Sequence, residues 1–356
     1  MHRQPSKHVV GNQEEVKMNK SVLFGAMTVA SLAAGAAAAG TLEDVQARGT
    51  LNCGVTTGLV GFAAPDASGE WKGFDVAVCR AVAAAVLGDG NAVEFVPTTG
   101  KTRFTALASG EVDVLSRTTT WTFSRDVDLK LDFHGVNYYD GQGFMVPKSL
   151  GVTSAKDLDG ATVCIQVGTT TELNLADFFR VNGITYEPVP TEKSSESRSL
   201  YQAEACDVYT TDASGLASAR STFADPDAHV ILPEIVSKEP LGPVTRHGDN
   251  QWGDIVRWTL NALISAEELG ITKANVAEMA AAPTNNPEIN RMMGTEGNLG
   301  EMLGLDADWA VRVIAAEGNY GEIFENHLGP NTQIGLERGL NAQWTDGGLL
   351  YSPPFR

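Results

Sequence analysis

Basic residues are scarce in this sequence. Its 356 residues include 26 lysines and arginines against 44 aspartates and glutamates, which gives a formal net charge of −18. Nucleic-acid binding needs a basic surface that contacts phosphates, so this charge argues against that class of partner. It also argues against docking on an anionic membrane surface, because the charges have the same sign.

The sequence also lacks the common signatures of catalytic and metal sites. It has no Gly-x-Ser-x-Gly, His-Glu-x-x-His or Walker motif, and its four cysteines form no Cys-x-x-Cys pair. The six histidines are scattered along the chain. We therefore predict a protein that is not an enzyme, has no catalytic residues, and binds neither a metal nor a cofactor.

Only one long apolar run is present, over residues 22–39, and it is rich in alanine and glycine. It follows Lys20 and ends in four alanines, a pattern typical of a cleavable signal peptide. We therefore predict that residues 1–39 are an N-terminal extension and signal peptide, which directs export to the periplasm. A retained membrane anchor is the alternative. Both Met1 and Met18 stay candidate start sites.

The four cysteines fall into two pairs along the chain. Cys53 and Cys79 lie in one half of the sequence, and Cys164 and Cys206 lie in the other. An exported protein meets an oxidising compartment, so we predict one local disulfide in each half. Four buried thiols are the alternative, because spacing alone does not fix connectivity.

Short strands and helices alternate in both halves of the sequence, a pattern typical of parallel α/β sheets. The first half has predicted strands at 50–55, 93–96 and 112–115, and helices at 73–87 and 102–109. The second has predicted strands at 162–167, 184–189 and 207–210, and helices at 171–181 and 194–205. Two further helices are predicted at 252–269 and 309–317. The length also favours two domains.

The two halves share a local pattern. Residues 104–121 and 197–214 each give a helix, a short turn, an Asp-Val pair and then a run of hydroxyl residues. Each polar run follows the carboxyl end of a strand, where open α/β sheets bind ligands. The segments 137–146 and 235–246 mix extended apolar residues with glycine and proline, which suggests two crossovers between lobes. The sequence thus predicts two lobes that face each other across a cleft.

Charged and hydroxyl residues of the two halves suit a zwitterionic ligand. Arg125 follows a Thr-Thr-Thr-Trp run that begins after Arg117, and a guanidinium among hydroxyls and free N–H groups suits a carboxylate. The run 168–171 opens a helix whose N–H groups also favour a carboxylate. Asp212 supplies a negative charge for an ammonium. The alternatives are helix capping for the threonines and a surface ion pair of Arg125 with Asp126 or Asp128.

Long stretches of the chain resemble the periplasmic amino-acid-binding proteins of ABC transporters, and especially the general L-amino-acid subgroup. The stretches that carry the resemblance are LNCGVTTGLVGF (51–62), GFDVAVCRAV (73–82), RFTALASGEVDVLSRTTTWTFSR (103–125), GVNYYDGQGFMV (135–146), VCIQVGTTTELNLADFFR (163–180), CDVYTTDASGL (206–216) and SKEPLGPVTRHGDNQW (237–252). The resemblance implies a two-lobed α/β fold, each lobe a mixed, mostly parallel sheet flanked by helices, with two crossover strands as a hinge.

The resemblance also implies how the chain is divided and what it meets. Lobe 1 is expected to be discontinuous, combining 40–138 with 246–356, while lobe 2 spans 139–245. The expected ligand is an L-amino acid, and the expected partner is an ABC permease in the inner membrane. We expect a monomer.

The same resemblance implies roles for individual residues. Arg125, Thr120 and the helix start at Thr169 and Thr170 are expected to hold the ligand carboxylate, with Thr120 and Thr170 donating backbone N–H groups. Asp212 is expected to hold the ammonium.

Three further residues complete the expected site. An oxygen of Thr118 is expected to help Asp212 hold the ammonium. Phe62 is a candidate ligand contact, with a place in the lobe core as the alternative. Arg117 stands where relatives have a small hydroxyl residue, so it is a candidate determinant of side-chain preference.

Two other functions fit the same scaffold. Some proteins with this fold are periplasmic dehydratases, in which an acid in the cleft protonates a leaving hydroxyl. The sequence offers no extra acid in the first-lobe motif, so this stays the alternative. A sensor domain is the third class.

Overall fold

The computed structural model describes residues 40–356, and the predicted signal peptide and start sites lie outside the described residues. Within 40–356, no helix is both long and apolar enough to cross a membrane. These residues belong to one compact unit.

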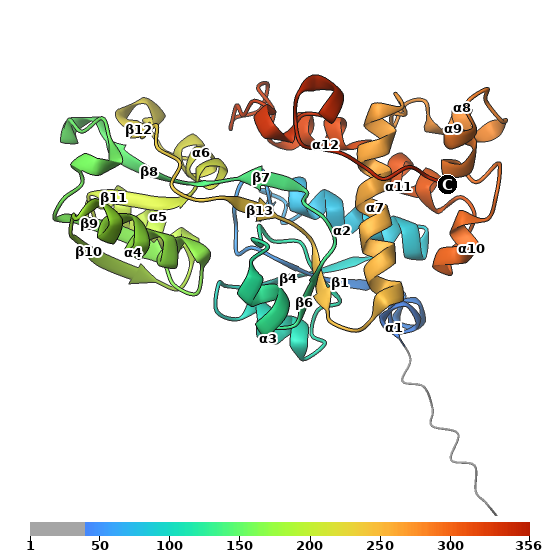
Figure 1. Ribbon diagram of the computed structural model, residues 1–356, viewed down its shortest axis with the longest axis horizontal. Coiled ribbons are helices and arrows are strands. Elements are labelled where there is room, and N and C mark those ends of the chain that lie inside the picture. The colour runs from blue at the N-terminus through green and yellow to red at the C-terminus, as the bar shows by residue number, and fades with distance from the viewer. Residues whose placement is uncertain (1–39) are drawn as a thin grey trace, which may run out of the picture. The chain divides into compact units, whose positions relative to one another are not determined.

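Two five-stranded sheets form the framework of the described chain (Figure 1). The first has the order β4 (Val93–Pro97), β1 (Leu51–Val55), β5 (Val114–Leu115), β14 (Val244–Arg246) and β6 (Leu131–Phe133). The second has the order β10 (Tyr186–Thr191), β9 (Ala161–Gln166), β11 (Val208–Asp212), β8 (Gln142–Pro147) and β12 (His229–Ile231). In each sheet the first three strands are parallel and the fourth is antiparallel to both of its neighbours. The predicted fold of two lobes with mixed sheets is therefore confirmed.

Helices cover both sheets. In the first lobe, α1 (Thr41–Arg48) precedes β1, and α2 (Phe74–Leu87) and α3 (Arg103–Ala108) follow later. In the second lobe, α4 (Thr170–Asn182), α5 (Ser194–Gln202) and α6 (Ala213–Ser221) each follow a strand of the sheet. A short hairpin, β2 (Ala64–Pro65) with β3 (Trp71–Lys72), precedes α2. Helix α2 consists mainly of buried alanines and valines, and it ends at Gly88, whose φ of 74° lies in the left-handed region that favours glycine.

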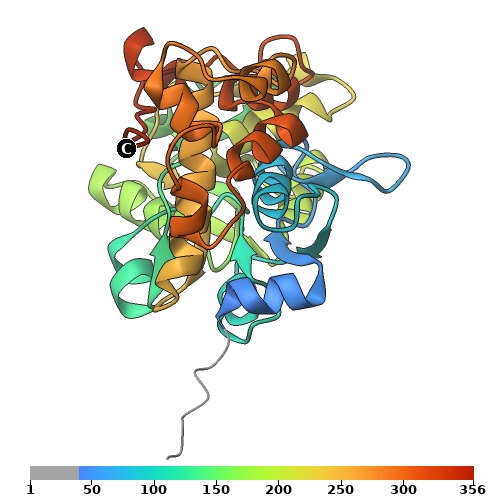
Figure 2. The same cartoon turned by 90° about the vertical axis from the view of Figure 1, so that its right-hand side faces the viewer.

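The C-terminal part of the chain packs on the helices of the first lobe. It consists of α7 (Asn250–Glu268), α8 (Val276–Ala281), α9 (Pro287–Met292), α10 (Leu299–Leu303), α11 (Trp309–Glu317) and α12 (Tyr320–His327). Helix α11 contacts both α2 and α7, and Figure 2 shows the later helices gathered around α7. Helices α8, α9, α10 and α12 were not predicted. They are short, and side-chain caps such as Asn286 and Asn319 start two of them within a glycine- and asparagine-rich sequence.

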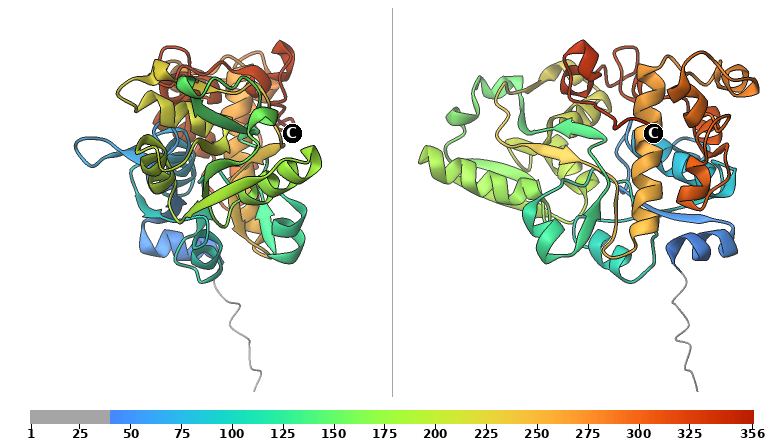
Figure 3. Two further views of the ribbon diagram at one scale, coloured as in Figure 1. Left: turned by 90° about the vertical axis from the view of Figure 1, so that its left-hand side faces the viewer. Right: turned by 45° about the vertical axis from the view of Figure 1, so that its right-hand side comes forward.

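Two antiparallel strands run between the sheets. They are β7 (Tyr138–Asp140) and β13 (Glu239–Leu241), with Glu239 opposite Asp140 (Figure 1, Figure 3). They lie within the two predicted crossover segments. The lobe boundaries at 138/139 and 245/246 stay a prediction.

The internal repeat predicted from the sequence has a common structural basis. The carboxylate of Asp113 accepts a hydrogen bond from the backbone N–H of Asn52 at 2.8 Å, and that of Asp207 accepts one from Thr162 N–H at 2.9 Å. Asn52 is the second residue of β1, and Thr162 is the second residue of β9. Each Asp-Val pair thus fixes one strand beside the next.

Both predicted disulfides are confirmed. Cys53 on β1 is bonded to Cys79 on α2, and Cys164 on β9 is bonded to Cys206 just before β11. All four side chains are buried. Each bond therefore joins a central strand to a neighbouring element of the same lobe.

Removing the second disulfide is expected to destabilise the protein. A variant with Cys164→Ala and Cys206→Ala should lose about 2–4 kcal/mol of unfolding free energy, because the bond closes a long loop in the unfolded chain. Urea denaturation followed by circular dichroism measures this loss. An unchanged denaturation midpoint would contradict the expectation, and adding a reductant to the wild-type protein serves as the control.

Candidate functional site

The segment that follows β5 is held in a fixed conformation. Asp75 on α2 accepts hydrogen bonds from Ser116 Oγ at 3.3 Å and from Thr118 N–H at 3.1 Å. Thr118 has a φ of 48°, a left-handed conformation that costs a non-glycine residue about 1–2 kcal/mol. Burial raises the pKa of Asp75 to about 7, against the hydrogen bond from Ser116. The contacts of Asp75 therefore stabilise a strained loop at the end of a strand.

The next residues of this segment are tied to the hinge. Gly242 N–H donates to Thr119 O at 3.1 Å, and Trp121 N–H donates to Pro240 O at 2.8 Å. These bonds place Thr120 opposite Leu241 in a β-bridge. In such a pair the backbone N–H and C=O of Thr120 point away from β13.

Arg125 lies in a π-helical turn, η1 (Ser124–Asp128), and is buried. Its Nη1 donates to Thr120 O at 2.8 Å, and its guanidinium lies 5.3 Å from the ring centre of Phe104. Burial lowers the pKa of Arg125 to about 10, while the charges of Glu239 and Asp212 raise it, so the group stays charged at neutral pH. Asp126 instead accepts from Trp121 Nε1 at 2.6 Å, and no ion pair with Asp126 or Asp128 is formed in the described chain.

Two more arginines are buried beside Arg125. The Nε atoms of Arg103 and Arg117 have no hydrogen-bond partner among residues 40–356. Arg103 reaches the other lobe, where its Nη2 donates to Gly168 O at 3.4 Å. Burial lowers the pKa of Arg117 to about 10, and the charge of Arg125 lowers it further. Unpaired guanidinium N–H groups in a buried place are suited to an anionic ligand.

The lobes approach each other closely at the start of α4. A side chain at Gly168 would meet the backbone of Gly100 at 3.1 Å, and Gly168 has a φ of 74°, so glycine suits this place on both counts. Thr169 is the N-cap of α4, and its Oγ1 accepts from Glu172 N–H at 3.2 Å. The hydroxyl of Thr169 therefore caps the helix, which was the alternative role considered for the threonines. The positive end of α4 faces the first lobe.

Asp212 lies where β11 ends and α6 begins, and its carboxylate makes no hydrogen bond within the described residues. Burial raises the pKa of Asp212 well above its usual value, and the negative charges of Asp140 and Glu239 raise it further. The positive charges of Arg125 and Arg103 lower it in part. The residue nevertheless keeps part of its surface accessible. An unpaired carboxylate in such a position can receive a cation.

The charges of these residues also influence the pKa of Arg103. The pKa of Arg103 is lowered by burial and by Arg117 and Arg125, and raised by Asp212 and Glu239. These groups come from both lobes and from the hinge.

Within the described residues, no group of three histidine, cysteine, aspartate or glutamate side chains is arranged to hold a metal ion.

Phe62 is not part of this cluster. It has 0% of its surface exposed and packs against Phe74 and Tyr138, with ring centres 6.3 and 5.5 Å away. Phe62 therefore packs in the core of the lobe, as the alternative expected, and its contact with a ligand stays a prediction. An aromatic residue after a first strand serves equally well in a core, so the sequence could not separate the two roles.

Sequence reasoning missed three charged residues of the cluster. Arg103 was assigned only to a helix, and Asp140 and Glu239 only to crossover segments. Asp140 accepts a hydrogen bond from the Ser214 hydroxyl, and burial raises its pKa to about 6. A charged residue inside an apolar crossover was the signal that could have identified Glu239.

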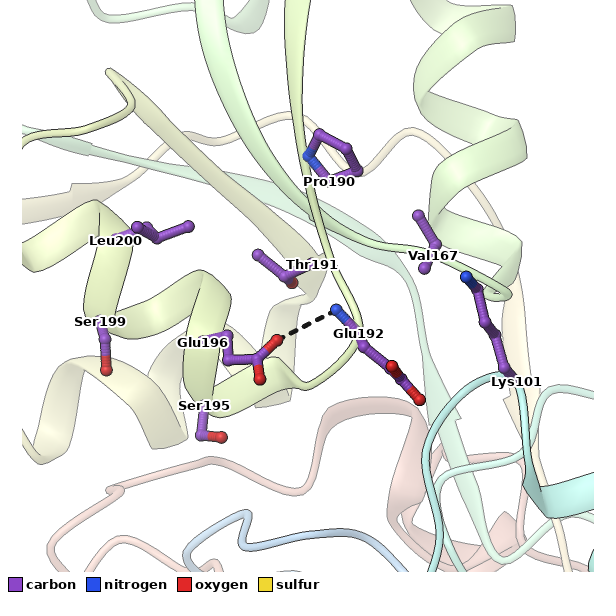
Figure 4. Close-up of a pocket in the computed structure, with 9 residues that line it drawn as sticks. All are labelled: Lys101, Val167, Pro190, Thr191, Glu192, Ser195, Glu196, Ser199 and Leu200. Carbon is purple, nitrogen blue, oxygen red and sulfur yellow. Dashed lines mark hydrogen bonds between the residues drawn. The ribbon is translucent and has the colours of Figure 1, made fainter.

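A separate recess lies beside this cluster and is shown in Figure 4. Its volume is about 760 Å³; Lys101 comes from the first lobe, and residues such as Val167, Glu192 and Leu200 come from the second. Within it, Glu192 N–H donates to Glu196 at 3.2 Å. None of the three buried arginines lines the recess, so we do not assign it as the main ligand site.

Two α/β lobes joined by two strands, with charged groups of both lobes buried between them, define a binding protein for a small polar molecule. Residues 51–275 match the model of the family described as bacterial extracellular solute-binding proteins, family 3. The chain belongs to this family.

Relatives match over nearly the full length. The glutamate/glutamine/aspartate/asparagine-binding protein BztA of Rhodobacter capsulatus is 66% identical, over 95% of this chain and all of the relative. The general L-amino acid-binding periplasmic protein AapJ of Rhizobium johnstonii is 57% identical over the same shares. A solved structure described as an ABC transporter periplasmic binding protein from Brucella ovis with glutathione bound is 56% identical, with a TM-score of 0.87, over 89% of this chain and all of that one. These relatives are binding proteins, so the dehydratase alternative is not favoured.

Proposed function

We propose that this chain captures an L-amino acid between its lobes in the periplasm and delivers it to an ABC permease in the inner membrane. The observation that carries the proposal is the cluster of three buried arginines with the partly accessible Asp212. In it, arginine Nε–H groups and the Asp212 carboxylate have no hydrogen-bond partner within the described residues. A zwitterion matches both signs at once. The names of the relatives support the same ligand class.

Each pole of the ligand has its own partners in this proposal. Arg125 and the backbone N–H groups of Thr120 and Thr170 hold the carboxylate, since Arg125 is already positioned by its bond to Thr120 O. Asp212 holds the ammonium, and the carbonyl of Thr118 completes its environment. Thr169 acts as the cap that orients the start of α4.

Arg117 and Arg103 favour a ligand whose side chain carries oxygen. Their Nε–H groups lack partners in the described chain, and a carboxylate or amide oxygen would supply one. The Rhodobacter relative is named for glutamate, glutamine, aspartate and asparagine. We therefore propose acidic and amide amino acids as the preferred class.

Isothermal titration against the twenty L-amino acids tests the proposal. We expect one site per chain and the highest affinity for glutamate, glutamine, aspartate or asparagine. D-enantiomers serve as the control, and glutathione belongs in the panel because it is named in the Brucella structure. Absence of binding to every member of the panel would refute the proposed function.

The proposed export, oligomeric state and delivery have separate tests. N-terminal sequencing of the exported protein would locate the cleavage expected near residue 39, and sedimentation would check the expected monomer. Delivery requires that the liganded, closed form presents both lobes to the permease.

Affinity is expected to rise as the pH increases toward the raised pKa of Asp212. Burial raises the pKa of Asp212 in the ligand-free protein, whereas a bound ammonium favours the ionised carboxylate, so binding releases a proton. Below the raised pKa, each pH unit should change Kd by up to about tenfold. Titrations in two buffers of different ionisation enthalpy count the released protons. A Kd independent of pH would contradict the role of Asp212.

A further inference from the structure

Glu239 on the hinge strand β13 is buried, with 1% of its surface exposed, and its carboxylate is fully occupied. Its Oε2 accepts from the hydroxyls of Thr120 at 2.6 Å and Thr170 at 2.9 Å. Its Oε1 accepts from Asn174 Nδ2 at 2.7 Å and from Ser237 Oγ at 2.7 Å. The Glu239 carboxylate thus connects three segments of the chain: the segment after β5, which holds Thr120, helix α4, and the crossover that holds Ser237.

These contacts fix the direction of two hydroxyl groups. A threonine hydroxyl has a single proton, and an ionised carboxylate can only accept. The protons of Thr120 and Thr170 are therefore directed at Glu239, although the two hydroxyl oxygens also lie 3.3 Å from each other. A ligand atom that approaches either hydroxyl meets lone pairs. Such a place accepts an N–H group and repels a carboxylate oxygen.

The charge of Glu239 acts in the same sense. It opposes the effect of burial on the pKa of both Arg125 and Arg103, so its negative charge offsets part of their positive charge. A ligand with a second carboxylate gains less from the arginines than it would without Glu239. The direction of the hydroxyl protons and the charge of Glu239 thus both disfavour a second carboxylate on the ligand.

We propose that Glu239 determines ligand preference, because it makes the hydroxyls of Thr120 and Thr170 acceptors and thereby favours amide side chains over the corresponding acids. The inference rests on the proposed function. It adds a residue that is not among those expected to touch the ligand, and it limits Thr120 and Thr170 to their backbone N–H groups as donors to a carboxylate.

The test is the ratio of the Kd values for glutamine and glutamate in the variant Glu239→Gln. The amide has nearly the same shape, removes the charge and can donate to a threonine oxygen, which frees hydroxyl protons for the ligand. We expect the ratio to shift toward glutamate by about tenfold or more, the size of one charge-assisted hydrogen bond. Both Kd values come from one preparation, so partial unfolding changes the stoichiometry and leaves the ratio intact.

Two further variants make the result specific. Glu234→Gln removes the same charge just before this crossover, where Glu234 accepts hydrogen bonds from the Ser154 hydroxyl and the N–H of Ala155, and it should leave the ratio unchanged. Glu239→Asp keeps the charge but withdraws the carboxylate by one methylene, so it should give a smaller shift toward glutamate.

The outcomes separate the two proposals. An unchanged ratio in both Glu239 variants, or a shift toward glutamine, would overturn the role of Glu239 and leave the proposed function standing. An equal shift in Glu234→Gln would also overturn it, because net charge would then be the cause. A wild-type protein that binds no amino acid would refute the proposed function itself, and this inference with it.

Discussion

Replacing Asp212 with asparagine is expected to weaken amino-acid binding by about 2–5 kcal/mol, the usual loss when one partner of a desolvated charge pair is removed. The carboxylate has no hydrogen bond within residues 40–356, and in the proposed complex it is the group that meets the ammonium. An amide of the same shape has no charge and can turn its own N–H groups toward the ligand. Titration calorimetry with the best ligand of the panel measures the change in Kd.

The same variant is expected to have an unchanged or raised melting temperature at neutral pH without ligand. Because the pKa of Asp212 is raised in the folded protein, its ionisation costs stability once the pH exceeds the unfolded value, and asparagine removes that cost. Asp225→Asn, at an exposed position of the same lobe, is the matched control. If Asp212→Asn melted far below the wild type, the loss of binding would be structural and the assigned role would be wrong.

Replacing Arg125 with methionine is expected to cost about 3–5 kcal/mol in binding, because the ligand carboxylate would lose its charged partner in a buried place. Methionine keeps much of the volume against Phe104 but neither the charge nor the bond to Thr120 O. Arg125→Lys should bind with intermediate affinity, since a lysine provides a point charge without the planar fork. Titration calorimetry with the same ligand compares the variants.

Arg180→Met is the control for charge removal, because Arg180 is exposed on α4 and, among residues 40–356, forms an ion pair only with Asp177 on the same helix. It should bind as the wild type does. Binding by Arg125→Met at wild-type affinity would show that the carboxylate is held elsewhere, with Arg103 and Arg117 as the next arginines to replace.

Much of the fold was predictable from the sequence. Helix 309–317 was predicted with the bounds that the structure has, and α2 and β1 were predicted to within one residue at each end. Local signals explain this success: apolar periodicity defines the buried face, and glycines such as Gly88 end the helices. The two disulfides were also predicted, because each joins cysteines of the same half.

The candidate site was predictable only in part. Arg125 and Asp212 follow strands at the edge where ligands bind, so the pattern of strands indicated them. Arg103 was not indicated, because a lone arginine at the start of a helix resembles a surface residue. The role of Phe62 was left open between the core and the ligand, because core packing and ligand contact favour the same aromatic residue.

The sequence by itself predicted most of the strands and helices of the two sheets, the two similar halves, one cysteine pair in each half and the presence of both charge signs after the strands. Only the tertiary structure decided which polar groups meet. Glu239 is 119 residues from Thr120 and 69 residues from Thr170 along the chain, and no local pattern connects them. The physical reason is that periodicity and capping act within a few residues, whereas the environment of a buried charge depends on every element that excludes water from it.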